Sequence, residues 1–192
     1  TFWMGFDQLH LGTGARPLRP DLPGIDLPFV HGVQTLDDAT HLLRHARQTE
    51  CRRVVVVGGG YIGLEMAEAF VVRGAAVSLV EGAPNVMRTL DPDVAARVET
   101  AIRKFGIDLR TGVDVKGFSD GMVHTAAGDL EADLVILGLG VVPNSELGAD
   151  AGLRTGSRNA LVVNPRQQTS HEAVWAAGDC CESCHTVSKR TG

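Results

Sequence analysis

The chain has 192 residues, of which 44% are hydrophobic and 21% are charged, with 18 Lys and Arg against 23 Asp and Glu and a formal net charge of −5. This length suits one large domain or two small ones, and the acidic balance disfavours nucleic acid or an anionic membrane as the main partner. No apolar run approaches the roughly 18 residues that a membrane span needs, and no signal peptide is apparent. Three of the four cysteines lie within five residues, which does not suit a secreted disulfide framework, so we expect a reducing, cytoplasmic setting.

The first part of the chain predicts a short strand, a linker and a helix. Phe6–Leu11 is partly apolar and stops at a glycine turn, Gly12 to Gly14, which is typical of a short strand. Prolines between Arg16 and Pro28 favour an extended connector, because proline fixes φ and cannot continue a helix. From Thr35 to Gln48 the apolar residues recur at three- and four-residue steps, which predicts an amphipathic helix.

Strands and helices alternate in the next segment. Residues 54–57 are four valines, typical of a strand buried on both faces, and helix formers follow from Tyr61 to Arg73. A second strand, 76–80, runs into Glu81, and a helix is predicted from Asp91 to Phe105. This alternation predicts a mostly parallel sheet with helices on its faces.

Shorter elements are predicted after residue 106. Turn signals separate four short segments that suggest a small antiparallel excursion, and three further strands are expected beyond them. The four segments are 107–109, 113–118, 122–126 and 129–132, and the three strands are 133–137, 161–163 and 173–176.

A glycine motif, Gly58-x-Gly60-x-x-Gly63, stands between the valine strand and the helix after it. Gly58 permits a tight turn, Gly60 lets the backbone approach a pyrophosphate, and Gly63 allows the helix to pack closely on the strand. The helix N-terminus offers unpaired N–H groups and the positive end of its dipole to phosphates. The alternative is a glycine-rich turn that only connects a strand to a helix.

Glu81 ends the next strand, 18 residues after Gly63. A carboxylate at this place can accept hydrogen bonds from a ribose 2′-OH and would repel a 2′-phosphate, so NADH is favoured over NADPH. A solvated acid at the end of a strand is the alternative.

Four segments, in this order, resemble the signature blocks of the FAD-dependent pyridine nucleotide-disulfide oxidoreductases. The closest subgroup by appearance is the coenzyme A-disulfide reductase, NADH oxidase and NADH peroxidase branch. The four segments are Leu11-Gly12-Thr13-Gly14-Ala15-Arg16-Pro17, Val57-Gly58-Gly59-Gly60-Tyr61-Ile62-Gly63-Leu64-Glu65-Met66-Ala67-Glu68, Gly138-Leu139-Gly140-Val141-Val142-Pro143-Asn144 and Val174-Trp175-Ala176-Ala177-Gly178-Asp179.

The resemblance implies an NAD(H)-binding domain, residues 29–144, inserted into an FAD domain of which 1–28 and 145–192 are segments. The expected fold class is α/β, a Rossmann-like three-layer domain with a mostly parallel sheet and a small antiparallel β excursion, flanked by partial FAD-domain segments. The family's first FAD-binding glycine motif has no counterpart here, and its redox-active cysteine is expected upstream. Its C-terminal dimerisation domain is also missing, and through it the full-length protein is expected to form a homodimer.

The resemblance also assigns cofactor-binding roles. Asp179 matches an acid that holds the ribityl chain or pyrophosphate region of the flavin, with a plain N-cap as the alternative. Tyr61 matches an aromatic that stacks near the flavin, and Glu65 an acid that helps to place the nicotinamide ring; the alternatives are packing and a solvated acid. No catalytic residue and no metal ligand is expected within the chain. The expected cofactor-binding set is Gly14, Gly58, Gly60, Tyr61, Ile62, Gly63, Glu65, Glu81, Gly140, Gly178 and Asp179.

The cysteine cluster permits several interpretations. Cys181-x-x-Cys184-His185 matches the spacing of covalent c-type haem attachment and, in its first four residues, that of a redox dithiol. The absence of an export signal and the position just after Gly178-Asp179 argue against haem. We interpret Cys180, Cys181 and Cys184 as ordinary thiols in a helix that begins near the flavin.

The sequence therefore predicts the nicotinamide-dinucleotide-binding part of a flavoprotein oxidoreductase. In the full-length protein, hydride would pass from NAD(P)H, with NADH favoured, to FAD and on to a disulfide, oxygen, peroxide or protein acceptor. The fragment alone is expected to be inactive. The alternative function is a non-catalytic NAD(H)-binding redox-sensing module, which would have no need of the Gly178-Asp179 block.

Overall fold

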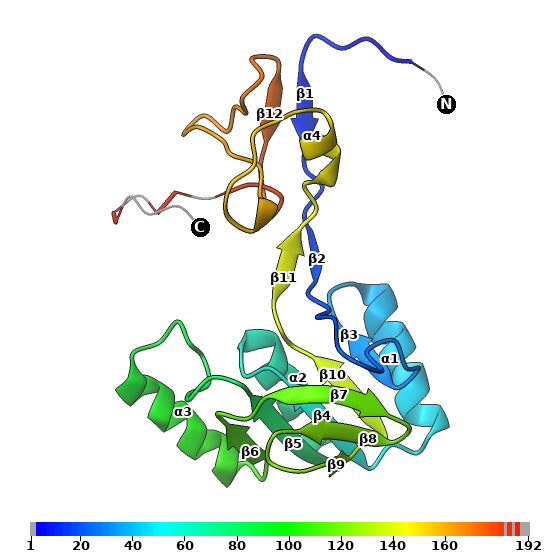
Figure 1. Ribbon diagram of the computed structural model, residues 1–192. Coiled ribbons are helices and arrows are strands. Elements are labelled where there is room, and N and C mark those ends of the chain that lie inside the picture. Colours follow the sequence, from blue (N-terminus) through cyan, green and yellow to red (C-terminus); the bar gives the residue numbers. More distant parts are fainter. Residues whose placement is uncertain (1–2, 183, 186, 189–192) are drawn as a thin grey trace. The chain divides into compact units, whose positions relative to one another are not determined.

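The computed structural model describes residues 3–182, 184, 185, 187 and 188 and divides into two compact units (Figure 1). The central unit comprises Pro17–Gly140, and the terminal unit comprises residues 1–16 together with 141–192. Within the described residues, no helix combines the length and the apolar character that crossing a bilayer requires.

The central unit is built around a five-stranded parallel sheet of order β3-β10-β4-β5-β6, and a separate antiparallel sheet of order β7-β8-β9. Its elements, in chain order, are β3 (Val30–Gly32), α1 (Leu36–Gln48), β4 (Arg53–Val57), α2 (Tyr61–Val72), β5 (Ala76–Glu81), α3 (Pro92–Lys104), β6 (Asp108–Thr111), β7 (Val115–Ser119), β8 (Met122–Thr125), β9 (Leu130–Glu131) and β10 (Leu134–Leu137).

The α/β class, the parallel sheet and the antiparallel excursion are confirmed. The prediction for residues 107–109 is wrong, because they were expected in the antiparallel excursion. Asp108–Thr111 forms β6, which pairs parallel to β5 at the edge of the parallel sheet, with Leu109 opposite Leu79. This is so because β6 follows helix α3, and a strand, helix, strand connection returns the chain parallel to the first strand.

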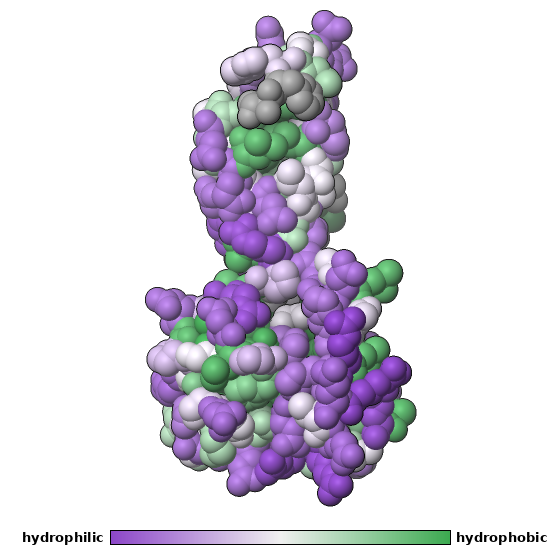
Figure 2. All heavy atoms as spheres, turned by 90° about the vertical axis from the view of Figure 1, so that its right-hand side faces the viewer, coloured by the Kyte–Doolittle hydropathy of each residue, from purple (hydrophilic) through white to green (hydrophobic). Residues whose placement is uncertain are grey.

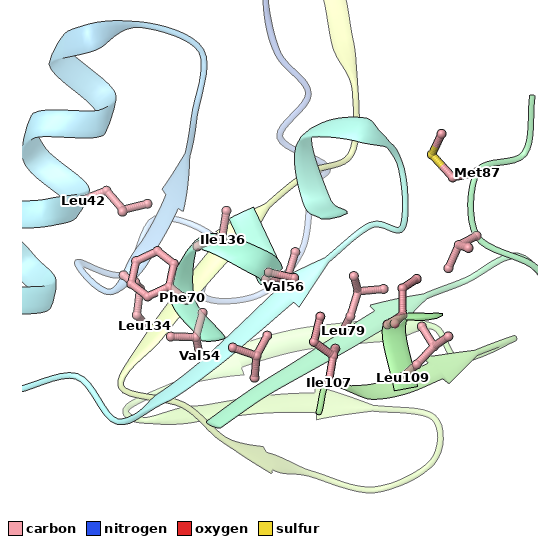
Figure 3. Packing of buried hydrophobic residues seen from close by; sticks show 14 residues of the cluster. Leu42, Val54, Val56, Phe70, Leu79, Met87, Ile107, Leu109, Leu134 and Ile136 are labelled. Carbon is pink, nitrogen blue, oxygen red and sulfur yellow. The ribbon is translucent and has the colours of Figure 1, made fainter. Parts of the chain in front are cut away.

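The two faces of the parallel sheet are covered differently. Val54 and Val56 pack with residues of α1, α2 and α3 in one hydrophobic cluster (Figure 3), whereas Val55 and Val57 pack in a second cluster with β7, β8 and β9. The valine run is therefore buried on both faces, as predicted. The prediction of helices on the sheet's faces is wrong for one face, which the antiparallel sheet covers because its own apolar residues, such as Phe118 and Val123, turn toward it.

The three helices of the central unit, α1, α2 and α3, begin and end within one residue of the predicted bounds. Thr35 caps α1 in a capping box, since its side chain accepts a hydrogen bond from the Asp38 N–H and the Asp38 carboxylate accepts one from the Thr35 N–H. Gly74 and Gly106, both with positive φ, follow α2 and α3. The side of the central unit that carries α1 is mostly hydrophilic in Figure 2, as expected for an amphipathic helix.

The terminal unit has few regular elements around a small core. Its elements are β1 (Leu9–Leu11), β2 (Ala15–Pro17), β11 (Val141–Pro143), α4 (Glu146–Asp150), a 3-10 helix (Ser157–Asn159) and β12 (Val174–Ala176). Strand β1 lies parallel to β12, and β2, whose last residue belongs to the central unit, pairs with β11. The predicted strand 161–163 is reduced to isolated bridges of Leu161, with Thr155 on one side and Cys181 on the other.

Asp133 joins the start of β4 to the start of β10. Its Oδ2 accepts hydrogen bonds from the N–H groups of Arg52 and Arg53, each 2.9 Å long, and its Oδ1 accepts one from the Arg53 guanidinium at 2.8 Å. The hydrogen bond from the Arg53 side chain is the main reason why the pKa of Asp133 is lowered from 3.8 to about 2.

Replacement of Asp133 by alanine should lower the free energy of unfolding by about 1–3 kcal/mol, because two backbone N–H groups lose their acceptor. The pKa is lower in the folded chain, so the carboxylate's contribution is complete above pH 4 and is lost as the pH falls from about 4 toward about 2. Denaturant unfolding of the parent chain and Asp133→Ala between pH 7 and pH 3 checks this, with the exposed Glu68→Ala as control. A stability difference that stays constant over this range would contradict the role of the carboxylate.

Candidate functional site

Three glycines meet where β4 and β10 end and α2 begins. Gly58 has φ +107°, and a Cβ on it would overlap the carbonyl oxygen of Gly138. A Cβ on Gly63 would overlap the carbonyl oxygen of Gly58, and a Cβ on Gly138 would lie 2.9 Å from the Cα of Gly63. Backbone therefore contacts backbone at each of these positions, and only glycine fits.

Gly60 differs from these three glycines. Its φ is −85°, which any residue adopts, and no atom lies within 4 Å of the place where a Cβ would stand. The fold itself therefore gives no reason for glycine at position 60. The open space suits a ligand that approaches the backbone closely, as a diphosphate does in a turn of this kind.

The N-terminus of α2 faces this space without a cap. Gly60 is the N-cap residue, and no side chain among the described residues caps the helix. The first N–H groups of a helix have no partner inside the helix, so the turn of Tyr61, Ile62 and Gly63 presents donors and a partial positive charge. This arrangement can bind phosphate oxygens.

Glu81 holds the other side of the turn. Its Oε2 accepts a hydrogen bond from the Gly59 N–H and its Oε1 accepts one from the Ala83 N–H, both 2.7 Å long. A carboxylate has about four acceptor sites, so two remain for the hydroxyl groups of a sugar.

A cavity of about 340 Å³ lies beside Gly58 and Glu81, within the central unit. It is at the carboxyl ends of β4 and β5, next to the place where the sheet order reverses between β4 and β10, which is where open α/β sheets bind their ligands. The residues that line it include two acids, and no Lys or Arg is among the described ones. The lining residues are Leu18, Pro20, Leu22, Val57, Gly58, Val80, Glu81, Gly82, Val113, Asp114, Val115 and Leu139.

Tyr61 and Glu65 are both exposed on α2, four positions apart and so on one face of the helix. The Tyr61 residue is 66% exposed, so its ring is available to a ligand rather than used in packing. Gly140 ends the central unit with φ +91°, and its carbonyl oxygen accepts a hydrogen bond from the Leu18 N–H.

The remaining expected site residues belong to the terminal unit. Gly178, with φ +84°, and Asp179 border a cavity of about 820 Å³. Gly14 has φ +66°, and its carbonyl oxygen accepts a hydrogen bond from the Asn144 N–H. The structure thus groups Gly58, Gly60, Tyr61, Ile62, Gly63, Glu65 and Glu81 in the central unit, and Gly14, Gly178 and Asp179 in the terminal unit. The lining of the larger cavity comprises Val141, Pro143, Ser157, Arg158, Ala160, Gln167, Gly178, Asp179, Cys181, Glu182 and Cys184.

The cysteines after Asp179 do not lie in a helix, contrary to our interpretation from the sequence. The Leu161 N–H donates to the Cys180 carbonyl and the Glu182 N–H donates to the Leu161 carbonyl, so this backbone pairs with another segment instead of coiling on itself. Asp179 is therefore no helix N-cap. Ser183, inside the Cys181–His185 motif, lies outside the described residues.

The environments of Cys180 and Cys181 do not favour a reactive thiol. Cys180 is buried, and burial is the main reason why the pKa of Cys181 is raised, which disfavours the reactive thiolate. Among the described residues, no group of three or more His, Cys, Asp or Glu side chains could hold a metal ion.

Two contributors were not singled out from the sequence. Gly138 contacts Gly58 and Gly63 at the end of β10. From the sequence, the Gly138-Leu139-Gly140 segment was noted only as part of the family resemblance, and Gly138 was given no role. Asp114 lines the cavity beside Glu81, and no local pattern distinguishes it from other surface acids.

Comparison with known proteins decides the family. The sequence profile described as pyridine nucleotide-disulphide oxidoreductase matches residues 2–191. The chain belongs to this family. An NADH oxidase of Methanocaldococcus jannaschii is 38% identical to it, with 94% of this chain and 41% of that protein covered. A CoA-dependent NAD(P)H sulfur oxidoreductase of Pyrococcus furiosus is 37% identical, with 95% and 42% covered.

Solved structures of this oxidoreductase family agree with the fold. The water-forming NADH oxidase of Lactobacillus brevis, solved with NADH bound, superposes with a TM-score of 0.92 at 29% identity, with 98% of this chain and 42% of that chain covered. The chain thus spans about two-fifths of the length of the curated relatives it matches.

Substitution of two glycines by valine should separate structure from binding. Gly60→Val should lower the stability by no more than about 1 kcal/mol, the cost of losing a favoured N-cap residue, and should lose NADH binding, because the side chain would fill the open space before α2. Gly63→Val should destabilise the fold by about 1–3 kcal/mol, because its Cβ meets the Gly58 carbonyl. Thermal unfolding and titration with NADH check both variants. Loss of the fold in Gly60→Val would show that this glycine, too, is structural.

Proposed function

We propose that the central unit binds NAD(H), with NADH preferred to NADPH, as part of a flavoprotein oxidoreductase. The observation that carries this proposal is the open space at Gly60, in front of an uncapped α2 and beside Gly58 and Gly63, which the fold holds in backbone contact. In this proposal the N–H groups of Tyr61, Ile62 and Gly63 bind the diphosphate.

Two carboxylates support the preference for NADH. Glu81 and Asp114 line the cavity beside the glycine turn, and Glu81 keeps acceptor sites for the ribose hydroxyl groups. Asp114 forms a surface ion pair with Lys116, which neutralises it only in part because both side chains are exposed. A 2′-phosphate placed here would meet negative charge.

The nicotinamide end would reach the exposed face of α2, where Tyr61 offers a ring for stacking and Glu65 an acceptor. Gly140, with its positive φ, would allow the backbone to pass close to the cofactor. These residues orient the nicotinamide and take no covalent part in hydride transfer.

The terminal unit would supply part of an FAD site. Gly178 and Asp179 border a cavity whose lining also carries polar side chains, among them Ser157, Arg158 and Gln167, which suits a polar dinucleotide. Gly14 would belong to the same flavin-binding part. When bound, FAD supplies the acceptor for the hydride of NADH. We propose residues 29–144 as the NAD(H)-binding domain and residues 1–28 and 145–192 as segments of the FAD domain, whereas the compact central unit begins at Pro17 and ends at Gly140.

We further propose that the full-length protein is a cytoplasmic homodimer whose redox cysteine and acceptor site lie outside this chain. As expected from the sequence, the final acceptor would be a disulfide, oxygen, peroxide or a protein. The names of its relatives are similarly varied and include an NADH oxidase, a sulfur oxidoreductase and a putidaredoxin reductase. The cavity at Gly178 and Asp179 favours a flavoprotein over a redox-sensing module, which would bind the nicotinamide dinucleotide alone.

Titration of the chain with NADH and NADPH tests the proposal. NADH should bind about tenfold or more tightly than NADPH, which corresponds to about 1.4 kcal/mol or more. Glu81→Ala should weaken NADH binding, because the acceptor for the ribose hydroxyl groups is lost. It should also reduce the preference for NADH over NADPH, because the negative charge that repels the 2′-phosphate is lost. Glu68→Ala is the control, since it also removes a carboxylate from the central unit but at an exposed position of α2. It should change neither the affinity for NADH nor that for NADPH. Tighter binding of NADPH by the parent chain would contradict the role of Glu81.

A further inference from the structure

Gly59, the residue between the first two glycines of the motif, is held from three sides. Its N–H donates to Glu81, and its carbonyl oxygen accepts a hydrogen bond of 2.9 Å from the Met87 N–H. Val86 is fully buried, and its Cγ1 would lie 2.8 Å from a Cβ on Gly59. The loop after β5 therefore supports the turn that the proposed function assigns to the diphosphate.

This loop is held in an unusual conformation. Met87 has φ +51°, in the left-handed region that a long side chain rarely adopts, and it is packed at the edge of the hydrophobic cluster (Figure 3). Such a conformation persists only where the surroundings stabilise it. The contacts of the loop with the rest of the central unit therefore determine where the Met87 N–H points.

Glu99, in the middle of α3, makes two of these contacts. Its Oε1 accepts a hydrogen bond of 3.3 Å from the Val86 N–H and one of 3.2 Å from the Asn85 side-chain amide. Glu99 does not line the cavity beside Gly58, so it does not reach the proposed ligand there. The hydrogen bonds of the described residues connect it to Gly59 through residues 85–87.

We propose that Glu99 is a positioning residue for dinucleotide binding: by holding the 85–87 loop, it fixes the backbone of Gly59 and hence the diphosphate turn. This inference rests on the proposed function, because it concerns the same turn. It adds that affinity for the dinucleotide depends on a residue of α3 that does not contact the ligand.

A single oxygen of Glu99 accepts both hydrogen bonds, so substitutions can separate the loss of this acceptor from the loss of the negative charge. The amide oxygen of glutamine can accept the same two bonds, so Glu99→Gln should preserve the loop, whereas Glu99→Ala removes the acceptor. Glu99→Leu keeps a side chain of similar size at this position and also lacks an acceptor. Arg97→Ala, on the same helix and exposed, is the matched control.

The experiment measures the NADH dissociation constant of each variant, together with its thermal unfolding and its amide hydrogen exchange. Glu99→Ala and Glu99→Leu should raise the dissociation constant about fivefold, since about one net hydrogen bond is lost from the support of the turn. Glu99→Gln and Arg97→Ala should stay within about twofold of the parent chain. In the first two variants, the amides of Gly59 and Met87 should exchange faster than in the parent chain, while that of Val55 in β4 does not.

The outcomes separate the two proposals. An unchanged dissociation constant in Glu99→Ala and Glu99→Leu, measured against a parent chain that binds NADH, would overturn the positioning role alone. Faster exchange at Val55 as well as at Gly59 would show general destabilisation and would also overturn the positioning role of Glu99. The same holds if Glu99→Gln does not keep the parent affinity for NADH. A parent chain that does not bind NADH would overturn the proposed function and, with it, the role of Glu99.

Discussion

The contact of Gly58, Gly63 and Gly138 is the constraint on which the rest of the central unit depends. Because no side chain stands between them, α2 begins directly against the ends of β4 and β10. The first turn of the helix is thereby placed at the carboxyl edge of the sheet, next to the reversal of strand order. At Gly60, unlike at these three glycines, no neighbouring atom occupies the place of a Cβ, so space is left there for a ligand.

Much of this arrangement can be predicted from the sequence because local signals and the fold agree. The valine run predicts a strand buried on both faces, the three- and four-residue apolar spacing from Thr35 predicts α1, and the glycine motif lies between a strand and a helix as its chemistry requires. At these positions the residues that favour the local element are also those that pack in the fold. The sequence pattern alone is therefore sufficient to predict the element and its burial.

What could not be predicted depends on partners distant in the sequence. The backbone after Asp179 contains good candidates for a helix start, yet it pairs with Leu161, which no local pattern reveals. β6 is as short as the antiparallel strands that follow it, and only its place beside β5 shows which sheet it joins. The support of Gly59 by Val86 and Met87 likewise arises from a loop whose sequence carries no motif.

Glu81 shows why a residue with a proposed ligand role also needs a structural description. Its two oxygens join the glycine turn to the backbone after β5, before any sugar is bound. A carboxylate at this position is thus part of the fold as well as the proposed recognition group. Changing it alters the shape of the site together with its charge.

The pairing of Leu9 in β1 with Val174 in β12 joins two segments that flank the central unit in the sequence. The small core of the terminal unit therefore needs β12, which is synthesised only after all of the central unit, whereas the central unit is one continuous stretch and can fold from its own residues.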